Sequence, residues 1–155
     1  MSNEDNIELL SRLPVFSKLE PSAVRLIAIA AETRHLRAGD ILFRQGDLAD
    51  CGYLLVSGAL ALDGIIDNGT VARGANIGDF LGETALIVAT KRHVTAVARQ
   101  NTTVLRVSRA LFLRVLEEYP ASAERLLRDV LVVINSVSKD LEAFRRGLIA
   151  GDGAV

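Results

Sequence analysis

Turn signals recur roughly every ten residues through the middle of the chain, and the apolar runs between them have the length of strands rather than helices. Gly39-Asp40, Gly46-Asp47 and Asp67-Asn68-Gly69 mark three of these turns. The Asn-Gly step predicts a tight hairpin, because such a turn needs positive φ angles. The expected strands are residues 35–36, 41–44, 53–56, 59–62, 94–98 and 103–107. This spacing predicts a small antiparallel β-roll, sandwich or barrel.

Helical patterns flank the strands on both sides. Residues 7–13 form an amphipathic pattern that stops before a proline, and residues 21–33 form one that begins with a proline. Ser108 is placed to cap a helix that reaches residue 118, and a longer helix follows over residues 121–148. The expected fold class is α+β, in one domain. It comprises N-terminal helices in residues 1–33 that pack on the roll, a jelly-roll-like β-roll of about eight strands in residues 34–107, and two C-terminal helices in residues 108–148.

The composition narrows the class of protein. The formal net charge is -1, so no basic excess indicates nucleic-acid binding. Cys51 is the only cysteine and cannot form an internal disulfide, and the chain does not open on a signal-peptide pattern. The most apolar run, residues 126–134, contains two charged residues and is too short to cross a bilayer. We therefore expect a soluble, cytoplasmic protein.

The last predicted helix carries a heptad seam of apolar residues at alternating three- and four-residue gaps. Its members are Leu127, Val130, Ile134, Val137, Leu141, Phe144 and Leu148. Packing of the seam on the chain's own roll is one explanation. Leu126, Leu131 and Val133 lie off the seam, however, and are available to cover the roll, which leaves the seam for a second chain. We therefore expect a homodimer.

The stretch after the hairpin combines groups that a phosphate ester needs. Gly82 lets the backbone approach a ligand, and Glu83 begins a predicted single helical turn over residues 83–86. Arg92 supplies a guanidinium that stays protonated and can grip two oxygens. The Glu83 carboxylate suits a ribose 2′-OH, with Arg92 compensating its charge, so the predicted ligand is a phosphorylated ribose. The alternative is an ordinary ion pair between Glu83 and Arg92 at the edge of the roll.

Several motifs follow one another in a fixed order. They are Leu13-Pro14-Val15-Phe16, Ala38-Gly39-Asp40-Ile41-Leu42-Phe43, Gln45-Gly46-Asp47, Tyr53-Leu54-Leu55-Val56-Ser57-Gly58, Gly78-Asp79-Phe80-Leu81-Gly82-Glu83-Thr84-Ala85-Leu86 and Arg92-His93-Val94-Thr95. Over residues 13–145 this order resembles the cyclic nucleotide-binding domain family, which includes the bacterial catabolite activator, protein kinase A regulatory subunits and cyclic-nucleotide-gated channels. The family's phosphate-binding cassette reads approximately F-G-E-x-A-L, a variable stretch and R-x-A-[TS]. The corresponding cassette here is residues 78–95.

The resemblance implies a role for each matching residue. Glu83 would bind the ribose 2′-OH and Arg92 the cyclic phosphate. The backbone groups expected nearby are those of Gly82, Thr84 and Ala85. The purine would lie between the roll, around Val71 and Arg73, and the final helix, where Val137 and Ser138 align with base-contacting positions.

Two features depart from the family pattern. His93 stands where a small residue is usual, and its imidazole either points out of the pocket or touches the ligand, which would make binding sensitive to pH at about 6–7. Because no threonine stands there, nothing supports a guanine-selective site, and cyclic AMP is favoured over cyclic GMP. The seven residues after Leu148 cannot build a helix-turn-helix domain, so neither direct DNA binding nor a channel or kinase role is expected.

Catalytic and metal-dependent alternatives have little support. A cupin-type metal site needs several histidines, and only His35 and His93 are present, so no metal is expected. An iron–sulfur sensor needs a cysteine set, whereas Cys51 stands alone. We predict a non-catalytic regulatory or sensor protein that binds a cyclic nucleotide and signals, through movement of its C-terminal helices, to an unknown partner or its dimer mate. The alternative is a dimeric protein-interaction module with an altered or degenerate ligand pocket.

Overall fold

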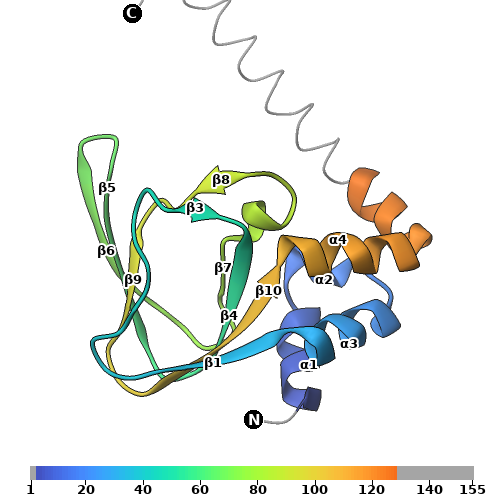
Figure 1. The fold of residues 1–155 in the computed structure, drawn as a ribbon, viewed down its shortest axis with the longest axis horizontal. Coiled ribbons are helices and arrows are strands. Elements are labelled where there is room, and N and C mark those ends of the chain that lie inside the picture. The colour runs from blue at the N-terminus through green and yellow to red at the C-terminus, as the bar shows by residue number, and fades with distance from the viewer. Residues whose placement is uncertain (1–2, 129–155) are drawn as a thin grey trace, which may run out of the picture.

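The computed structural model describes residues 3–128, and Figure 1 shows a β-roll with helices gathered along one side. The helices are α1 (Asn3–Ser11), α2 (Pro14–Ser17), α3 (Pro21–Ala30), the 3₁₀ helix η1 (Glu83–Leu86) and α4 (Arg109–Glu118). The strands are β1 (Glu32–Leu36), β2 (Ile41–Phe43), β3 (Leu48–Ala49), β4 (Cys51–Ser57), β5 (Leu60–Ile66), β6 (Gly69–Ala75), β7 (Phe80–Leu81), β8 (Thr90–Lys91), β9 (Thr95–Ala98) and β10 (Thr102–Ser108). The predicted α+β class is confirmed.

Two four-stranded antiparallel sheets and a small ribbon make up the roll. The sheet orders are β1-β10-β4-β7 and β2-β9-β5-β6, and the ribbon pairs β3 with β8. β5 and β6 pair over seven residues each as a long hairpin that stands on the side of the roll away from the helices (Figure 1). The ribbon and η1 lie between that hairpin and the helices.

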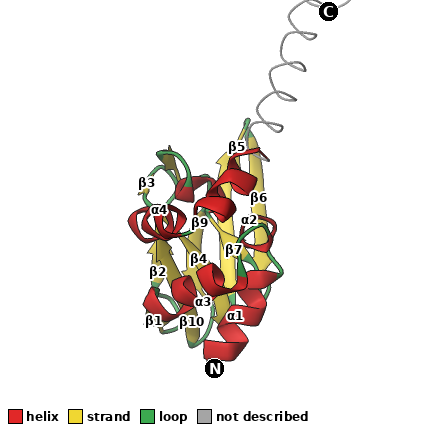
Figure 2. Cartoon of the chain, turned by 90° about the vertical axis from the view of Figure 1, so that its right-hand side faces the viewer, coloured by secondary structure: helices red, strands yellow, loops and turns green. Residues whose placement is uncertain are grey.

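Two apolar clusters hold the molecule together. One lies inside the roll and includes Leu55, Leu60, Leu62 and Val104. The other lies between the helices and the outer face of β4 and β10, and includes Leu10, Phe16, Leu54, Leu105 and Phe112. Neighbouring strand residues point to opposite faces, which is why Leu54 and Leu55 enter different clusters. Figure 2 shows the helices as a layer in front of the strands.

Three turns of the roll share one geometry, and each ends in a glycine-aspartate pair. Gly39, Gly46 and Gly78 have φ angles of 92°, 91° and 96°. The carboxylates of Asp40, Asp47 and Asp79 accept hydrogen bonds from the backbone N–H groups of Arg37, Arg44 and Asn76 at 2.8, 3.0 and 2.8 Å. At the predicted hairpin, both Asp67 and Asn68 have positive φ, which is the geometry of the primed turns that join tightly paired strands.

The structure corrects two boundaries. The helix predicted over residues 21–33 ends at Ala30, and residues from Glu32 onward form β1. Pairing of β1 with β10, from Glu32 opposite Arg106 to Leu36 opposite Thr102, overrides the helical pattern at that end. The helix expected over residues 7–13 begins earlier, at Asn3, and ends at Ser11.

Residues 120–128 are helical and contact the helical layer. Leu126 is 6% exposed within that layer, whereas its neighbour Leu127 is 57% exposed. The N–H of Glu20 donates to the hydroxyl of Ser122 at 2.8 Å and so ties this segment to the start of α3. Leu126 therefore covers the domain as expected, and the rest of the predicted seam lies outside the described residues. Within residues 3–128, no helix is both long enough and apolar enough to span a membrane.

Candidate functional site

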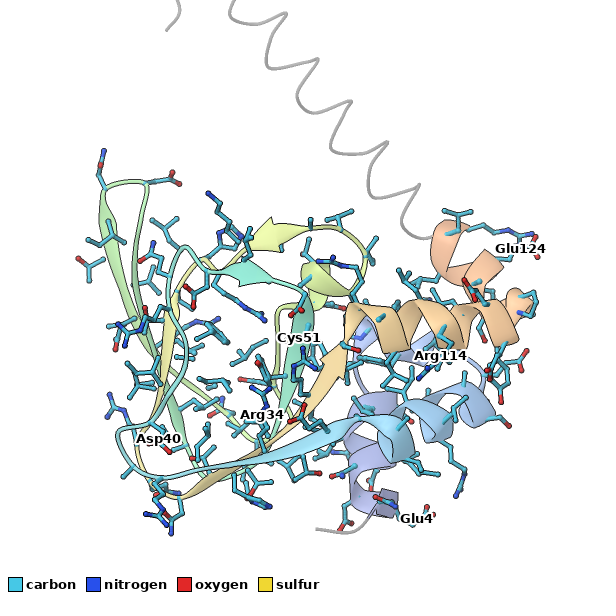
Figure 3. The ribbon with its side chains drawn as sticks, in the orientation of Figure 1. Glu4, Arg34, Asp40, Cys51, Arg114 and Glu124 are labelled. Carbon is cyan, nitrogen blue, oxygen red and sulfur yellow. The ribbon has the colours of Figure 1, made fainter. Side chains whose placement is uncertain are left out.

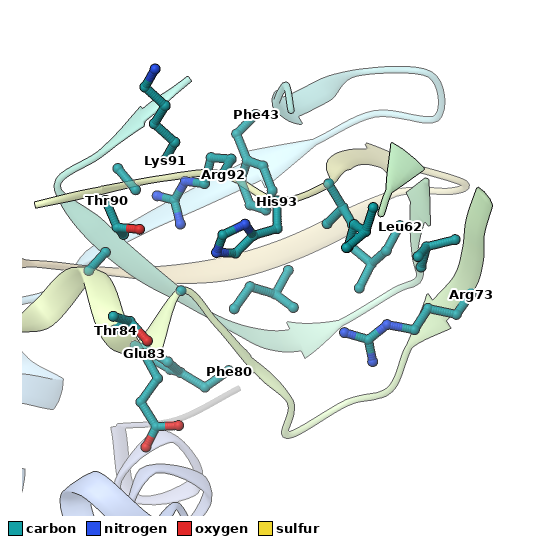
Figure 4. Close-up of a pocket in the computed structure, with 17 residues that line it drawn as sticks. Phe43, Leu62, Arg73, Phe80, Glu83, Thr84, Thr90, Lys91, Arg92 and His93 are labelled. Atoms are coloured by element: carbon teal, nitrogen blue, oxygen red, sulfur yellow. The ribbon is translucent and has the colours of Figure 1, made fainter. Parts of the chain in front are cut away.

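A cavity of about 310 Å³ lies between η1, the strand β8 and the β5–β6 hairpin (Figure 4). Its wall contains eight of the residues predicted for the site, which are Val71, Arg73, Gly82, Glu83, Thr84, Ala85, Arg92 and His93. The hairpin and the cassette follow one another in the sequence, and the fold of the roll brings both of them together with Phe43 and Ala49 from the earlier strands. Val137 and Ser138, which were aligned with base-contacting positions, lie outside the described residues.

Gly82 forms the entry to η1. It adopts φ 88° and ψ 35°, a left-handed conformation that a residue with a Cβ rarely takes. The next four residues, Glu83–Leu86, make the single helical turn expected from the sequence, as a 3₁₀ helix. A Cβ at position 82 would overlap Nη1 of Arg92, so Gly82 is also what allows the guanidinium to lie against the backbone here.

Arg92 is buried at the base of the cavity, with 7% of its surface exposed. Its Nη2 donates to the carbonyl oxygen of Cys51 at 2.8 Å and lies 3.3 Å from the Cys51 sulfur. The guanidinium carbon is 4.5 Å from the centroid of the Phe43 ring and 5.4 Å from that of Tyr53. Ring faces attract cations, so these contacts fix the orientation of the guanidinium. All of the groups that hold it are formally neutral.

The expected compensation between Glu83 and Arg92 is not formed. Figure 4 shows the Glu83 carboxylate directed away from the Arg92 guanidinium. Within residues 3–128, Arg92 takes part in none of the ion pairs. The ordinary ion pair considered as an alternative is therefore also absent from this part of the chain. A cation removed from water without an opposite charge is costly, so the cavity favours an anion beside Arg92.

His93 and Arg73 face the same cavity from different walls. Figure 4 shows the His93 imidazole beside the Arg92 guanidinium, in the inward of the two orientations left open by the sequence. Arg73 projects from β6 toward the cavity on the opposite side, whereas Lys91 points away from it. Arg73 and Arg92 thus place two guanidinium groups on the lining of the cavity. Among residues 3–128, no group of three or more His, Cys, Asp or Glu side chains is placed to bind a metal ion.

Sequence reasoning missed the residues that support Arg92. Cys51 and Tyr53 lie two apart on β4 and therefore share a face, the one toward the inside of the roll, which a period-two pattern could have indicated (Figure 3 labels Cys51). Tyr53 packs parallel to Phe43, with ring centroids 6.0 Å apart. Burial raises the pKa of the Tyr53 phenol above its ordinary value of 10.0, so the ring stays neutral at physiological pH.

Gly82→Ala is expected to weaken ligand binding and to lower the free energy of unfolding by about 1–3 kcal/mol, since the backbone strain and the displaced Arg92 act together. Gly74→Ala is the matched control, because a Cβ there meets only Leu60 O at 3.8 Å. Thermal melts and calorimetric titrations of both variants measure the two effects. Equal melting and equal binding in the two variants would contradict the close packing of Gly82 on Arg92.

Comparison with known proteins places the chain in a family. The profile described as "Cyclic nucleotide-binding domain" matches residues 33–119, which contain the roll, the cassette and α4. The chain therefore belongs to the cyclic nucleotide-binding domain family.

Two similar curated proteins are named cAMP-dependent protein kinase regulatory subunit. The one from Schizosaccharomyces pombe is 33% identical over 109 residues, which are 70% of this chain and 26% of that protein. The one from Dictyostelium discoideum is 27% identical over 146 residues, which are 92% of this chain and 44% of that protein. The chain thus spans less than half the length of these relatives.

Solved structures are similar as well. The cyclic nucleotide-binding-like protein from Brucella abortus is 44% identical with a TM-score of 0.67, and the match covers 73% of this chain and 98% of that one. The catabolite activator protein of Thermus thermophilus is 26% identical with a TM-score of 0.63, covering 86% of this chain and 63% of that one. The description of the family supports a cyclic nucleotide as the ligand.

Proposed function

We propose that this chain is a non-catalytic regulatory protein that binds a cyclic nucleotide in the cavity, with cyclic AMP favoured over cyclic GMP. The observation that carries the proposal is the buried guanidinium of Arg92, held only by neutral groups and facing a cavity. A cyclic phosphate supplies the missing negative charge and two oxygens for a bidentate contact. The preference for adenine is supported by His93, which stands in place of threonine. It is also supported by the two relatives named cAMP-dependent protein kinase regulatory subunit.

Glu83 takes a role in this proposal that requires its side chain to turn. The residue lines the cavity, while Figure 4 shows its carboxylate directed away from Arg92. Rotation about its side-chain bonds, after a ligand has entered, would bring the carboxylate to a ribose 2′-OH. In this arrangement Arg92 would hold the cyclic phosphate and Glu83 the ribose hydroxyl. Val71, Arg73 and Ser138 are proposed to lie near the purine.

Binding is proposed to shift an equilibrium between positions of the C-terminal helices, and a partner or a second copy of the chain reads that shift. The rival function is a dimeric protein-interaction module whose cavity has lost its ligand. A thermal-shift measurement separates the two. Ligand at one hundred times its Kd stabilises a protein by about 2.7 kcal/mol, so saturating cyclic AMP should raise the Tm by several degrees. An unchanged Tm with both cyclic nucleotides at millimolar concentration favours the interaction module.

A homodimer is predicted through the seam of residues 127–148. The side-chain exposure of two neighbouring leucines supports this prediction. Leu126 is buried in the helical layer, whereas Leu127, the first residue of the seam, is exposed and available to a second chain. Light scattering at tens of micromolar protein should give the mass of two chains. A monomeric mass under those conditions would contradict the seam as a contact between chains.

A further inference from the structure

His93 is the one histidine that lines the cavity among residues 3–128, and it directly follows Arg92. Figure 4 shows its imidazole beside the Arg92 guanidinium, so a phosphate bound to Arg92 would lie within reach of both groups. Within the described part of the chain, the ring nitrogens of His93 have no hydrogen-bond partner. The residue is exposed to solvent, which lets the ring exchange a proton with water. The imidazole is therefore free both to bind an anion and to change its charge.

The other charged side chains on the lining of the cavity are Arg73, Glu83, Lys91 and Arg92. Arg73 faces His93 from the opposite wall, Lys91 points away from the cavity, and the Glu83 carboxylate is directed away from Arg92 (Figure 4). A protonated imidazole beside Arg92 places two positive charges together, and a bound phosphodiester, with its negative charge, would attract both of them. The phosphate and the charged form of His93 thus stabilise each other.

The elements packed against this segment supply no further charge to the cavity. In the turn between β2 and β3, Asp47 O accepts the N–H of Arg92 at 2.8 Å, and the Asp47 carboxylate accepts the N–H of Arg44 at 3.0 Å. On β5, which pairs with β9, Asp63 is exposed. None of these three side chains, of Arg44, Asp47 and Asp63, lines the cavity. Carboxyl, ammonium and guanidinium groups have ordinary pKa values outside the range of about pH 5.5 to 8.0, whereas that of the histidine side chain lies within it.

We infer that nucleotide binding is coupled to the uptake of a proton by His93, so that the cavity binds its ligand more tightly in mild acid than at alkaline pH. This inference rests on the proposed function, because it needs a phosphate on Arg92. A protonated imidazole donates from both ring nitrogens and supplies a charge-assisted hydrogen bond beside those of the guanidinium. The phosphodiester keeps its single negative charge over this range of pH. Because linkage is reciprocal, a ligand that favours the protonated ring is itself favoured by protons. The site therefore responds to pH as well as to nucleotide.

Calorimetric titration of the full chain with cyclic AMP at about pH 5.5 and about pH 8.0 tests the inference. The affinity should be about three- to tenfold higher at the lower pH, the effect of up to one proton bound per ligand. At about pH 6.5, titrations in two buffers with different enthalpies of ionisation should give different heats of binding, with the sign that uptake of a proton by the protein requires.

Two variants assign the proton to His93. His93→Gln keeps a side chain that forms hydrogen bonds but carries no charge, and His93→Ser puts a small residue at the same exposed position. Each should bind cyclic AMP with the same affinity at both pH values and with the same heat in both buffers. His35→Gln is the matched control, because His35 lies on β1, its Nδ1 is 3.1 Å from the Thr103 hydroxyl oxygen, and it does not line the cavity. This control should keep the full pH dependence.

Equal wild-type affinities at the two pH values, or heats that do not depend on the buffer, would overturn the inference and leave the proposed function standing. A pH dependence that survives in His93→Gln and His93→Ser would also overturn it, because another group would then take up the proton. Wild-type protein that binds no nucleotide at either pH would overturn both the inference and the proposed function.

Discussion

Arg92→Ala is expected to weaken the binding of cyclic AMP by at least a factor of about ten. The substitution removes the one cation among residues 3–128 that is buried in the cavity wall, and with it the proposed charge-assisted hydrogen bonds to a cyclic phosphate. Such bonds are each worth about 1.5–3 kcal/mol when the partner is charged. The neutral groups that now hold Arg92, namely Cys51, Phe43 and Tyr53, cannot replace that charge.

Two further variants show whether the loss belongs to the guanidinium. Arg92→Lys keeps a positive charge but cannot make a bidentate contact, so intermediate affinity is expected. Arg99→Ala removes an exposed arginine that does not line the cavity and should bind as the wild type does. Calorimetric titration of the three variants measures the affinities. Unchanged binding in Arg92→Ala would mean that the phosphate site lies elsewhere.

Phe16→Ala is expected to lower the free energy of unfolding by about 3–5 kcal/mol, the usual loss when a buried phenylalanine is truncated. Phe16 is 1% exposed, and its ring makes edge contacts with Phe80 and Phe112 at centroid separations of 5.3 and 5.8 Å. It thereby joins α2 to β7 and α4. Because Phe80 also lines the cavity, some loss of ligand affinity should accompany the loss of stability.

Urea denaturation measures this change in stability. Leu48→Ala is the control, because Leu48 is 81% exposed and its truncation should change the free energy of unfolding by less than about 0.5 kcal/mol. Similar unfolding midpoints for the two variants would contradict the packing of the N-terminal helices on the roll.

The parts of the fold that local chemistry determines could be predicted from the sequence. Asn68-Gly69 indicated the hairpin, but the two residues with positive φ are Asp67 and Asn68, so the turn lies one residue earlier than the Asn-Gly step. Ser108 was expected to cap the following helix, and its hydroxyl accepts the N–H of Leu111 at 3.0 Å. A single helical turn was likewise expected after Gly82, and η1 forms there as a 3₁₀ helix. In each case the determining contacts lie within a few residues of the chain.

The parts that depend on distant partners could not be predicted. The strands β3, β7 and β8 have two residues each and exist only through pairing, so they leave no periodic pattern. The guanidinium of Arg109 donates hydrogen bonds to the backbone carbonyl oxygens of Ala85 and Ala49. Every residue has such a carbonyl group, so no sequence motif marks these contacts. Glu83 and Arg92 both line the cavity, but the direction of each side chain depends on neighbours from other strands.

Calorimetric titration of the wild-type protein with cyclic AMP and cyclic GMP tests the central claim most directly. A cavity that holds an uncompensated guanidinium for a cyclic phosphate predicts saturable binding of one nucleotide per chain, tighter for cyclic AMP. The Arg92→Ala variant, titrated under the same conditions, should bind cyclic AMP with an affinity at least about tenfold lower. No detectable heat with either nucleotide at millimolar concentration, in protein that also shows no thermal shift, would contradict the account.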